Sequence, residues 1–402
     1  MRFAHISDCH IGGWRDPRLR DANARSFKLA ISKCIERRVD FVLISGDLFN
    51  TAVPAIDSLR MAVEQLRCLK DANIPVYIIA GSHDFSPSGK TMLDVLERAA
   101  LVVCVAKGRE LDDGRLRLEF TQDPKTGVKI TGMVGKKGGL EAGYYSILSK
   151  ENLEREPGKK IFLFHTALQE LKPKGLEKME AMPVSYLPRG FDYYAGGHVH
   201  IVKNQSIGPY SNIVYPGPVF PNNFRELEQL KCGSFVIVED GNIEFVKLPV
   251  NEVVSIEVSA KDKTPLEVES EIRSHIGQHS LKDAIVTIRV KGCLIKGRPA
   301  DINWNDLVHD CSSKGAYATL RNTSGLASRE IELISLPGAD VDHIEERLVQ
   351  EHAPKFSFSR DDVGLSKSLI QVLSAEKKEG ERIGDFESRL HSELDSLFDL
   401  SF

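Results

Sequence analysis

Five short polar segments in the first half of the chain carry the side chains whose types and spacing could do chemistry. They occur in the order Asp8 with His10, Gly46 with Asp47, Ser82 with His83 and Asp84, His165, and His198 with His200. Imidazole and carboxylate ligands together suit Mn, Fe, Zn or Mg. One carboxylate shared by two clusters can bridge a pair of ions roughly 3.5 to 4 Å apart. The segments therefore predict a two-metal site in which Asp47 is the natural bridge.

Apolar runs precede the first four segments and read as strands, at residues 3–6, 41–44, 76–80 and 161–164. Each polar group would then stand at the carboxyl end of a strand, where open α/β sheets place their sites. A single histidine beside a strand is more often a hydrogen-bonded core residue. Five of the twelve histidines fall in these segments, however, and chance does not account for that number, so we interpret the set as ligands.

A resemblance to a known family rests on the same segments. Residues 8–10, 46–49, 81–84, 164–165 and 197–200 resemble the five signatures of calcineurin-like metallophosphoesterases, in the right order and over roughly residues 1–250. Within that superfamily, residues 3–12, 45–49 and 215–218 most resemble the DNA-end nucleases of the SbcD type. Their archaeal and eukaryotic relatives are meiotic-recombination nucleases of double-strand-break repair. The resemblance implies a DNA nuclease that depends on two divalent ions, with Mn²⁺ expected.

The resemblance also implies a role for each polar residue. One ion would be held by Asp8, His10, Asp47 and His200, and the second would be surrounded by Asp47, Ser82, His165 and His198. Two cations over a phosphodiester neutralise its oxygens, activate a water and stabilise the departing alkoxide. His83 would protonate the leaving oxygen. Asp84 would either orient His83 or accept hydrogen bonds from backbone amides of its own turn.

Two positions depart from the family pattern, and three functions stay open because of them. Ser82 stands where the third motif usually has Asn, and a neutral hydroxyl on a shorter side chain is a weaker ligand. Asn50 stands where many members carry a His implicated in exonuclease action and bacterial ones can carry Asp. An amide does no acid–base catalysis near neutral pH. The alternatives to a nuclease are a non-catalytic DNA-end scaffold and a phosphodiesterase for a small nucleotide substrate.

The apolar pattern predicts an α/β fold, a sheet structure flanked by helices. Helices are expected at residues 22–38, 55–72 and 91–99, and strands at 2–7, 40–45, 75–80, 128–134, 160–165, 192–196, 212–216 and 233–239. By resemblance this is a metallophosphoesterase β-sandwich, and helices near residues 55–100 would form a homodimer.

The chain divides into three expected domains, at residues 1–250, 251–335 and 336–402. After residue 250 the pattern restarts with alternating Val254, Ile256 and Val258. A helix at 264–277, a strand at 284–290, a helix at 303–314 and a strand at 329–335 complete a small α/β unit. In the family this unit would be the capping domain beside the active site.

The last segment is acidic and reads as largely helical. It holds 8 lysines and arginines against 15 aspartates and glutamates, a net charge of −7, which leaves +3 for residues 1–335. An apolar stripe at steps of three and four runs through Ile383, Phe386, Leu390, Leu394 and Leu397. Such a stripe packs against its own domain or binds a partner. By resemblance the segment would bind the coiled-coil base of an SMC-like ATPase of the SbcC type.

A body this weakly basic does not by itself demand DNA, because phosphate binding needs only a local cationic face. Candidate residues for such a face are Arg15, Arg18, Arg20, Lys90, Lys136, Lys137 and Lys203, and ordinary solvated surface is the alternative for each.

Several features predict a cytoplasmic protein. No apolar run reaches the ~18 residues that a membrane span needs, and the chain starts without a signal-peptide pattern. The seven cysteines include no CxxC pair, which fits reduced thiols. Cys9 lies between two proposed ligands, but strand alternation points it to the opposite side.

Overall fold

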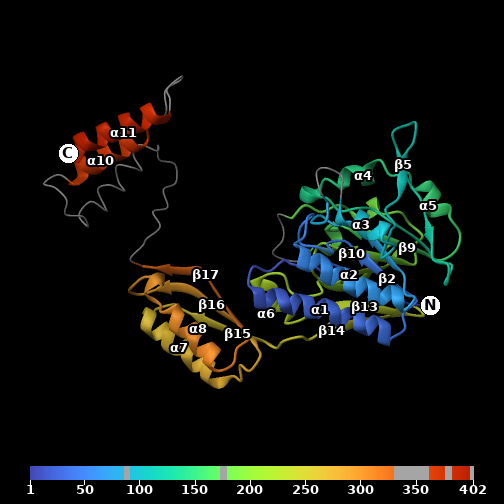
Figure 1. Cartoon of the computed structure of the whole chain (residues 1–402), viewed down its shortest axis with the longest axis horizontal. Helices are drawn as coiled ribbons and strands as arrows, with labels where there is room; N and C mark the ends of the chain where they lie inside the picture. Colours follow the sequence, from blue (N-terminus) through green and yellow to red (C-terminus); the bar gives the residue numbers. More distant parts are fainter. Residues whose placement is uncertain (86–90, 173–178, 330–361, 376–382, 399–402) are drawn as a thin grey trace. The chain divides into compact units, whose positions relative to one another are not determined.

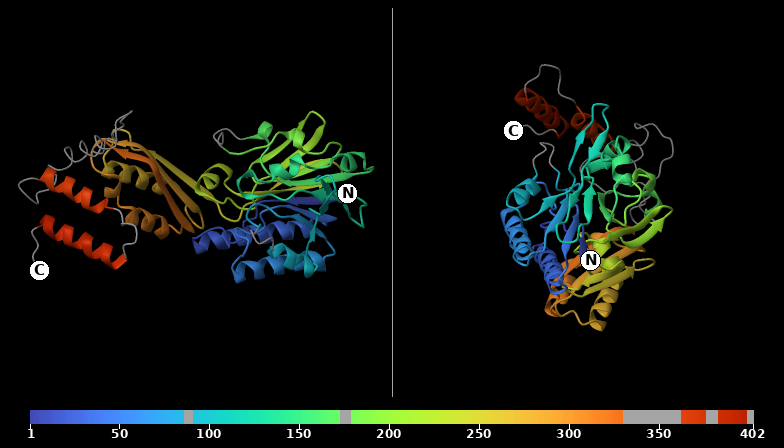
Figure 2. Two further views of the ribbon diagram at one scale, coloured as in Figure 1. Left: turned by 90° about the horizontal axis from the view of Figure 1, so that it is seen from above. Right: turned by 90° about the vertical axis from the view of Figure 1, so that its right-hand side faces the viewer.

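The computed structural model describes residues 1–85, 91–172, 179–329, 362–375 and 383–398. The chain forms two compact units, Met1–Glu330 and Ile331–Phe402. Among the described residues, no helix combines the length and the apolar character that a membrane span requires. Figures 1 and 2 show the arrangement of the elements within each unit.

The first sheet has six strands in the order β14-β13-β1-β2-β3-β4. β1 to β4 are parallel, while β13 is antiparallel to β1 and β14 is antiparallel to β13. The strands are β1 (Arg2–Ile6), β2 (Phe41–Ser45), β3 (Val76–Ile79), β4 (Val103–Cys104), β13 (Gly233–Glu239) and β14 (Asn242–Leu248).

The second sheet also has six strands, in the order β11-β12-β10-β9-β8-β7. β8, β9, β10 and β12 are parallel, and antiparallel β7 and β11 form the edges. The strands are β7 (Thr121–Gln122), β8 (Lys129–Gly132), β9 (Lys160–His165), β10 (Tyr193–Gly197), β11 (Val202–Ile207) and β12 (Tyr210–Pro216), and a hairpin of β5 (Gly108–Glu110) and β6 (Leu116–Leu118) stands beside them.

The two sheets pack face to face through one side of each strand. On β1, Phe3 belongs to the apolar cluster between the sheets, whereas Ala4 and Ile6 belong to the cluster under the helices. This division follows from the alternation of side chains along a strand. Phe41 from the first sheet and Ile161 from the second lie in the same inter-sheet cluster. The result is a β-sandwich of the class predicted from the sequence.

Helices α1 (Pro17–Glu36), α2 (Ile56–Asp71) and α3 (Met92–Arg98) cover the outer face of the first sheet (Figure 1). The start predicted for α1, residue 22, was too late. Asp16 caps the helix by accepting a hydrogen bond from the Arg18 amide, and Pro17 fits the first turn, where its missing N–H is not needed. Shorter elements lie in the loops of the second sheet, namely α4 (Ala142–Ser146), α5 (Glu151–Arg155) and the 3₁₀ turns η1 (Lys137–Gly139), η2 (Gln169–Leu171) and η3 (Val184–Tyr186). Helix α6 (Phe224–Leu230) packs against the part of the chain after residue 250.

A third, fully parallel sheet follows residue 250, in the order β15-β16-β17. It consists of β15 (Val253–Ser259), β16 (Ile285–Leu294) and β17 (Ala318–Ser328), with α7 (Pro265–Gln278), η4 (Pro299–Asp301) and α8 (Trp304–Ser313). α7 and α8 cover one face. Val253, Ile285 and Ala318 share an apolar cluster with Leu19 of α1 and Leu227 of α6, which joins this sheet to the sandwich.

The third strand of this sheet, β17, was not predicted from the sequence. The predicted strand at 329–335 lies almost wholly outside the described residues, and the observed strand is β17. β17 is largely polar and only its two end residues are buried, so it lacks the apolar alternation that marks a strand in the sequence.

The second unit contains α10 (Asp362–Leu373) and α11 (Ile383–Phe398), which pack against each other. The helix predicted for the apolar stripe is therefore present as α11. Phe386, Leu390 and Leu394 of the stripe are each only half-buried.

Candidate metal centre

The carboxyl ends of five parallel strands bring the polar segments together across the sandwich. Asp8 follows β1, Asp47 follows β2 and His83 follows β3, all in the first sheet. His165 ends β9 in the second sheet, and His198 follows the neighbouring β10. Backbone hydrogen bonds join the loops, from the Asp8 amide to the Gly46 carbonyl (3.2 Å) and from the His10 amide to the Asp47 carbonyl (3.0 Å). The fold thus builds one site from both sheets.

Five of the candidate ligands have a left-handed backbone, a conformation that residues other than glycine rarely adopt. Their φ angles are +50° for Asp8, +41° for His10, +52° for Asp47, +92° for His198 and +55° for His200. Such conformations cost about 1 to 3 kcal/mol each and persist only where the surroundings enforce them. These strained residues lie in the loops that follow the strands. Their conformations lower the stability of the fold and at the same time place the side chains of the candidate ligands.

Asp47 lies at the centre of the cluster. Its Oδ2 is 3.1 Å from His165 Nε2 on one side and 3.7 Å from His10 Nε2 on the other. The same oxygen accepts a hydrogen bond from Ser82 Oγ (3.4 Å), while Oδ1 accepts one from the His83 amide (2.7 Å). One carboxylate therefore faces histidines of both sheets, which is the geometry that a bridging ligand requires.

Three overlapping triads place their possible ligand atoms within 4.8 Å of one another: Asp8, His10 and His200; His10, Asp47 and His83; and Asp8, Asp47 and His165. Seven of the residues singled out from the sequence, including Ser82, thus meet in one buried cluster. His198 lies beside it, with its ring centroid 5.2 Å from that of His165.

The nitrogen atoms that face into the cluster fit a cation. His10 Nε2 and His200 Nε2 are 2.9 Å apart. Two ligands at right angles around an ion, each ~2.1 Å away, would lie about 3 Å apart. His165 Nε2 is buried and, despite its closeness to Asp47, makes no hydrogen bond. Coordination of an ion at this nitrogen would replace the proton that its pairing with Asp47 favours.

Three histidines are oriented by an oxygen atom behind the ring. His165 Nδ1 lies 2.8 Å from the Ser45 carbonyl, His83 Nδ1 lies 2.7 Å from the Asn50 carbonyl, and His200 Nδ1 lies 2.9 Å from Glu226 Oε1. Because each of these oxygens accepts from an Nδ1–H, the neutral ring keeps its Nε2 lone pair for a ligand.

Electrostatics favour the protonation states that a metal needs at most positions. Burial acts to raise the pKa of Asp47, but His165, His10 and the His83 amide outweigh it and hold that pKa well below its usual range. Burial, followed by the neighbouring His200, lowers the pKa of His10 to about 3. Burial, followed by His165, lowers the pKa of His198 to about 4.

His200 and His165 are the exceptions, because a proton on either ring competes with a cation. Burial lowers the pKa of His200, but the carboxylates of Asp8 and Glu226 outweigh burial and raise that pKa. The shift is larger at His165. Burial lowers its pKa, but the Asp47 carboxylate outweighs burial and raises the pKa to about 10. An ion that binds at Nε2 must therefore displace this proton.

Asp84 supports the site through the backbone. Its carboxylate accepts hydrogen bonds from the amides of Leu48 (3.1 Å), Phe49 (2.9 Å) and Gly81 (3.1 Å), which ties the second motif to the third. His83 is oriented by the Asn50 carbonyl, so the structure supports the second of the two roles considered for Asp84. Burial and the nearby charge of Asp47 raise the pKa of Asp84 to about 7, although its three amide partners act in the opposite direction.

Comparison with known proteins agrees with this geometry. Residues 1–202 match the model of the calcineurin-like phosphoesterase family. A protein of Methanocaldococcus jannaschii named "DNA double-strand break repair protein Mre11" is 30% identical over 277 residues, which cover 65% of this chain and 70% of that protein. The chain belongs to the calcineurin-like phosphoesterase family, in its Mre11 branch. It is accordingly a metal-dependent phosphodiesterase.

Two further relatives carry the same name and differ in how much of their length is matched. The protein of Archaeoglobus fulgidus is 24% identical over 419 aligned positions, which cover 96% of this chain and 92% of that protein. The protein of Methanococcus maripaludis is 33% identical over 215 residues, which cover 50% of this chain and 52% of that protein. The similarity therefore extends over nearly the whole chain in one relative and over half of it in the other.

One of the basic candidates lies at the rim of the site. The ammonium of Lys136 is 4.2 Å from the ring centroid of Tyr144 and 5.1 Å from that of Phe85, two residues after His83. The preceding Gly135 touches His165, because a Cβ on that glycine would lie 2.6 Å from His165 Cδ2. Lys136 is thus a cation held beside the metal centre by two aromatic rings.

The positions of the other basic candidates give less support for a role in phosphate binding. Arg18 forms an ion pair with Asp16 (3.1 Å), Arg20 donates to the Trp14 carbonyl (3.0 Å), and both are exposed, as is Arg15. Lys137 is exposed, and Lys203 is half-buried on the edge strand β11. Lys90 lies outside the described residues.

The residues that orient the candidate ligands were not recognised in the sequence. Glu226, on α6, accepts from His200 and is fixed by the Asn222 amide (2.7 Å). An asparagine followed three residues later by an acidic residue is a helix-start signal, and Asn223 with Glu226 has this spacing. That signal locates the helix start, but it does not show that the carboxylate reaches a histidine 26 positions away. Cys9 is buried in the core under the helices, as strand alternation predicted.

Proposed function

We propose that the chain is a two-metal nuclease that hydrolyses phosphodiester bonds at DNA ends during double-strand-break repair. The observation that carries the proposal is the position of Asp47, whose Oδ2 stands between His165 Nε2 (3.1 Å) and His10 Nε2 (3.7 Å). A carboxylate between two groups of ligands is what a pair of ions requires. The substrate follows from the relatives, which are named as DNA double-strand break repair proteins.

Each residue of the site has a place in this proposal. Asp8, His10, Asp47 and His200 would hold one ion, and Asp47, Ser82, His165 and His198 would surround the other. When bound, the two ions supply charge neutralisation and an acidic water. Mn²⁺ suits a mixed set of imidazole and carboxylate ligands. His83, whose Nδ1–H is held by the Asn50 carbonyl, would protonate the leaving oxygen from Nε2 in its imidazolium form.

DNA would approach over Lys136. A lysine fixed between Phe85 and Tyr144 offers an ammonium at the rim for a backbone phosphate, and the rings offer faces on which an unpaired base can stack. Arg15, Arg18, Arg20 and Lys203 remain weaker candidates, since the contacts of Arg18 and Arg20 are with the protein itself.

A homodimer is part of the proposal. Three large apolar side chains on or next to α2 and α3 face solvent, with exposed fractions of 78% for Val53, 83% for Ile56 and 54% for Val95. Burial of such side chains between two copies would remove them from water. This supports the expectation that helices near residues 55–100 form the contact.

An SMC-like ATPase is the proposed partner of the second unit. On α11, the half-buried Phe386, Leu390 and Leu394 keep part of an apolar stripe available in an acidic segment. A helix of this kind fits a groove on another protein. All seven cysteines are free, which fits the reducing cytoplasm where such a complex would act.

The test is cleavage of an end-labelled DNA duplex and of a single strand in Mn²⁺, with EDTA as the metal-free control. Asp47→Asn removes the bridging charge, and we expect it to reduce cleavage by at least about 10²-fold. Asp240→Asn is the matched control, because Asp240 is an aspartate at the opposite end of the sandwich that pairs with the chain's amino group (2.9 Å). It should cut DNA like the wild type.

The scaffold function is the second candidate, favoured by Ser82, whose hydroxyl points to Asp47 as a donor. Mn²⁺ and DNA binding without any cleavage would support it and overturn the nuclease. Cleavage that EDTA abolishes but Asp47→Asn leaves intact would show that the metal acts elsewhere.

A further inference from the structure

A chain of buried hydrogen bonds crosses the layer between the two sheets. The hydroxyl of Tyr193, on β10, lies 2.9 Å from His5 Nδ1, on β1. His5 Nε2 lies 2.7 Å from Ser45 Oγ, at the end of β2, and Ser45 Oγ donates to the Gly196 carbonyl (3.1 Å). His5 and Ser45 have no exposed surface, and Tyr193 is 3% exposed. The surrounding inter-sheet cluster is otherwise built from apolar side chains such as Phe3 and Leu43.

Counting protons fixes the direction of every bond in this chain. The Ser45 hydroxyl has one hydrogen, which goes to the Gly196 carbonyl, so it must accept from His5 Nε2–H. In a neutral imidazole the other nitrogen is then an acceptor, and Tyr193 donates to it. Burial lowers the pKa of His5 to about 3, which keeps the ring neutral, while its contact with Gly196 acts weakly in the opposite direction. Every polar side-chain atom in this series of hydrogen bonds therefore has a partner.

This series of hydrogen bonds leads to His165, a candidate metal ligand. The backbone carbonyl of Ser45 accepts the Nδ1–H of His165 (2.8 Å). The space around this carbonyl is tight, because a Cβ on Gly197 would lie 2.3 Å from it. Ser45 also stands two residues before Asp47. Any shift of Ser45 therefore changes both the ring angle of His165 and its distance from Asp47.

We infer that His5, Ser45 and Tyr193 are positioning residues that set the orientation of His165 and hold the two halves of the metal centre at a fixed spacing. The inference rests on the proposed function, because it refers to the same metal centre. The physical reason is that the ligands come from two separate sheets, and an apolar layer alone would let the sheets slide with little directional preference. A chain of directed hydrogen bonds has one geometry.

The experiment measures Mn²⁺ affinity by calorimetry, together with unfolding in EDTA, for variants of the full chain. His5→Leu removes both ring contacts, and Tyr193→Phe removes one hydroxyl. Tyr77→Phe is the matched control, because the buried Tyr77 hydroxyl also bridges the two sheets, to Asp123 (2.8 Å), but reaches no candidate ligand. His5→Gln restores a donor toward Ser45 and tests rescue.

We expect His5→Leu to weaken Mn²⁺ binding by about tenfold at the weaker of the two ion sites. Substitution of a residue that orients a metal ligand typically lowers metal affinity by about 10- to 100-fold, and the expected loss is at the low end of that range. Tyr193→Phe should also weaken Mn²⁺ binding, but by a smaller factor. His5→Gln should recover most of the wild-type affinity. Tyr77→Phe should lose stability like Tyr193→Phe but keep wild-type affinity. Equal affinity in all variants, or losses that follow stability in Tyr77→Phe as well, would overturn the inference.

If His5→Leu fails to fold, the comparison of the two Tyr→Phe variants still decides. A wild type that binds no Mn²⁺ would instead contradict the proposed function, so the two failures are distinguishable.

Discussion

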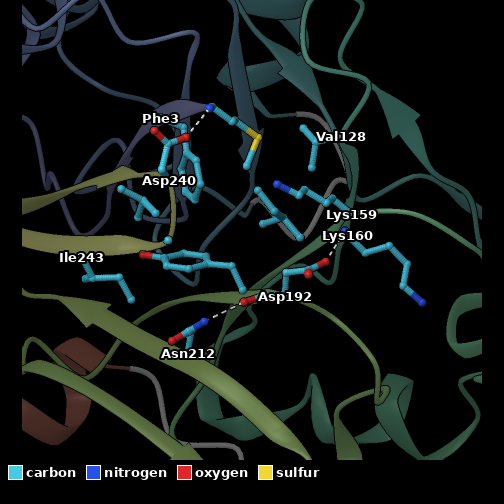
Figure 3. Close-up of a pocket in the computed structure, with 13 residues that line it drawn as sticks. Phe3, Val128, Lys159, Lys160, Asp192, Asn212, Asp240 and Ile243 are labelled. Atoms are coloured by element: carbon cyan, nitrogen blue, oxygen red, sulfur yellow. Dashed lines mark hydrogen bonds and ion pairs between the residues drawn. The ribbon is translucent and has the colours of Figure 1, made fainter.

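The two ends of the sandwich are made from the same strands and differ in almost every other respect. At the carboxyl ends, buried aspartates and histidines face one another from left-handed backbone positions, and His165 Nε2 has no hydrogen bond. At the amino ends there is a pocket of about 230 Å³, with Phe3, Ile161 and Tyr193 in its walls (Figure 3). Its two carboxylates have partners, since Asp240 pairs with the terminal amino group and Asp192 accepts a hydrogen bond from the Lys160 amide.

The difference shows that a hollow is a weaker sign of function than a cluster of buried aspartates and histidines that face one another. The pocket is a hollow whose carboxylates have partners, although Asn212 and Asp240 in its lining also have a left-handed backbone. The carboxyl end is crowded, yet its side chains are arranged for something that binds between them. Matched substitutions at the two ends can test this contrast.

The largest effect should come from a glycine at each end with the same backbone conformation. Gly46 (φ +90°) and Gly241 (φ +88°) both become strained as alanine, but a Cβ on Gly46 would meet His165 Nδ1 at 2.3 Å, whereas Gly241 has nothing within 4 Å. We expect Gly241→Ala to lose about 1 to 2 kcal/mol of unfolding free energy and to keep its activity. Gly46→Ala should also displace His165 and reduce DNA cleavage by at least about 10²-fold.

Denaturant unfolding in EDTA and DNA cleavage in Mn²⁺ check this pair. The contrast between the two ends fails if Gly46→Ala loses no more stability than Gly241→Ala and still cuts DNA at the wild-type rate.

Sequence patterns predicted which polar residues meet in this cluster and not the groups that orient them, for a physical reason. Asp8, Asp47 and His165 directly follow apolar runs, and strand ends in a parallel sheet share an edge, so their meeting depends only on local pattern. The contact of Ser45 with His165 spans 120 positions and depends on how the two sheets pack. His5 sits inside a run that reads as apolar, where it looks like one more interior strand residue.

The fold shows the same division. Strands with continuous apolar runs, such as β9, were placed within a residue or two, and the helix predicted for the terminal stripe is present as α11. The polar strand β17 was missed, because its pairing with β16 holds it in place and its own side chains do not mark it.

The second-largest effect concerns the stability of the fold and depends on pH. It comes from His5, which lies in the layer between the two sheets. The folded state keeps this ring neutral, with a pKa of about 3 against 6.5 in the unfolded chain. Between these values only the unfolded chain binds the proton, so His5 makes the protein less stable as the pH falls below 6.5. From pH 7 to 4.5 the loss from this residue should be about 2 to 3 kcal/mol.

This loss of unfolding free energy is measured by unfolding the wild type and His5→Gln in EDTA across this pH range. The glutamine variant should lose less stability toward low pH than the wild type does. His279→Gln is the control, because His279 is exposed after α7, and its curve should parallel the wild type. Parallel curves for His5→Gln as well would mean that the ring is protonated in the folded state, which contradicts the bond directions assigned to Tyr193 and Ser45.

The smallest effect concerns DNA affinity and compares one lysine at each end. Lys136 is held against Tyr144 and Phe85 beside the metal centre, whereas Lys159 is exposed at the rim of the amino-end pocket. Both variants to glutamine remove one positive charge, so the change in net charge is the same. If DNA lies over the metal centre, Lys136→Gln should weaken DNA binding in EDTA by about three- to tenfold and lower the salt dependence by about one counterion. Lys159→Gln should leave both quantities unchanged. Equal losses in the two variants would show that DNA responds to overall charge and has no preferred end, and the two ends would then differ in chemistry without differing in what they bind.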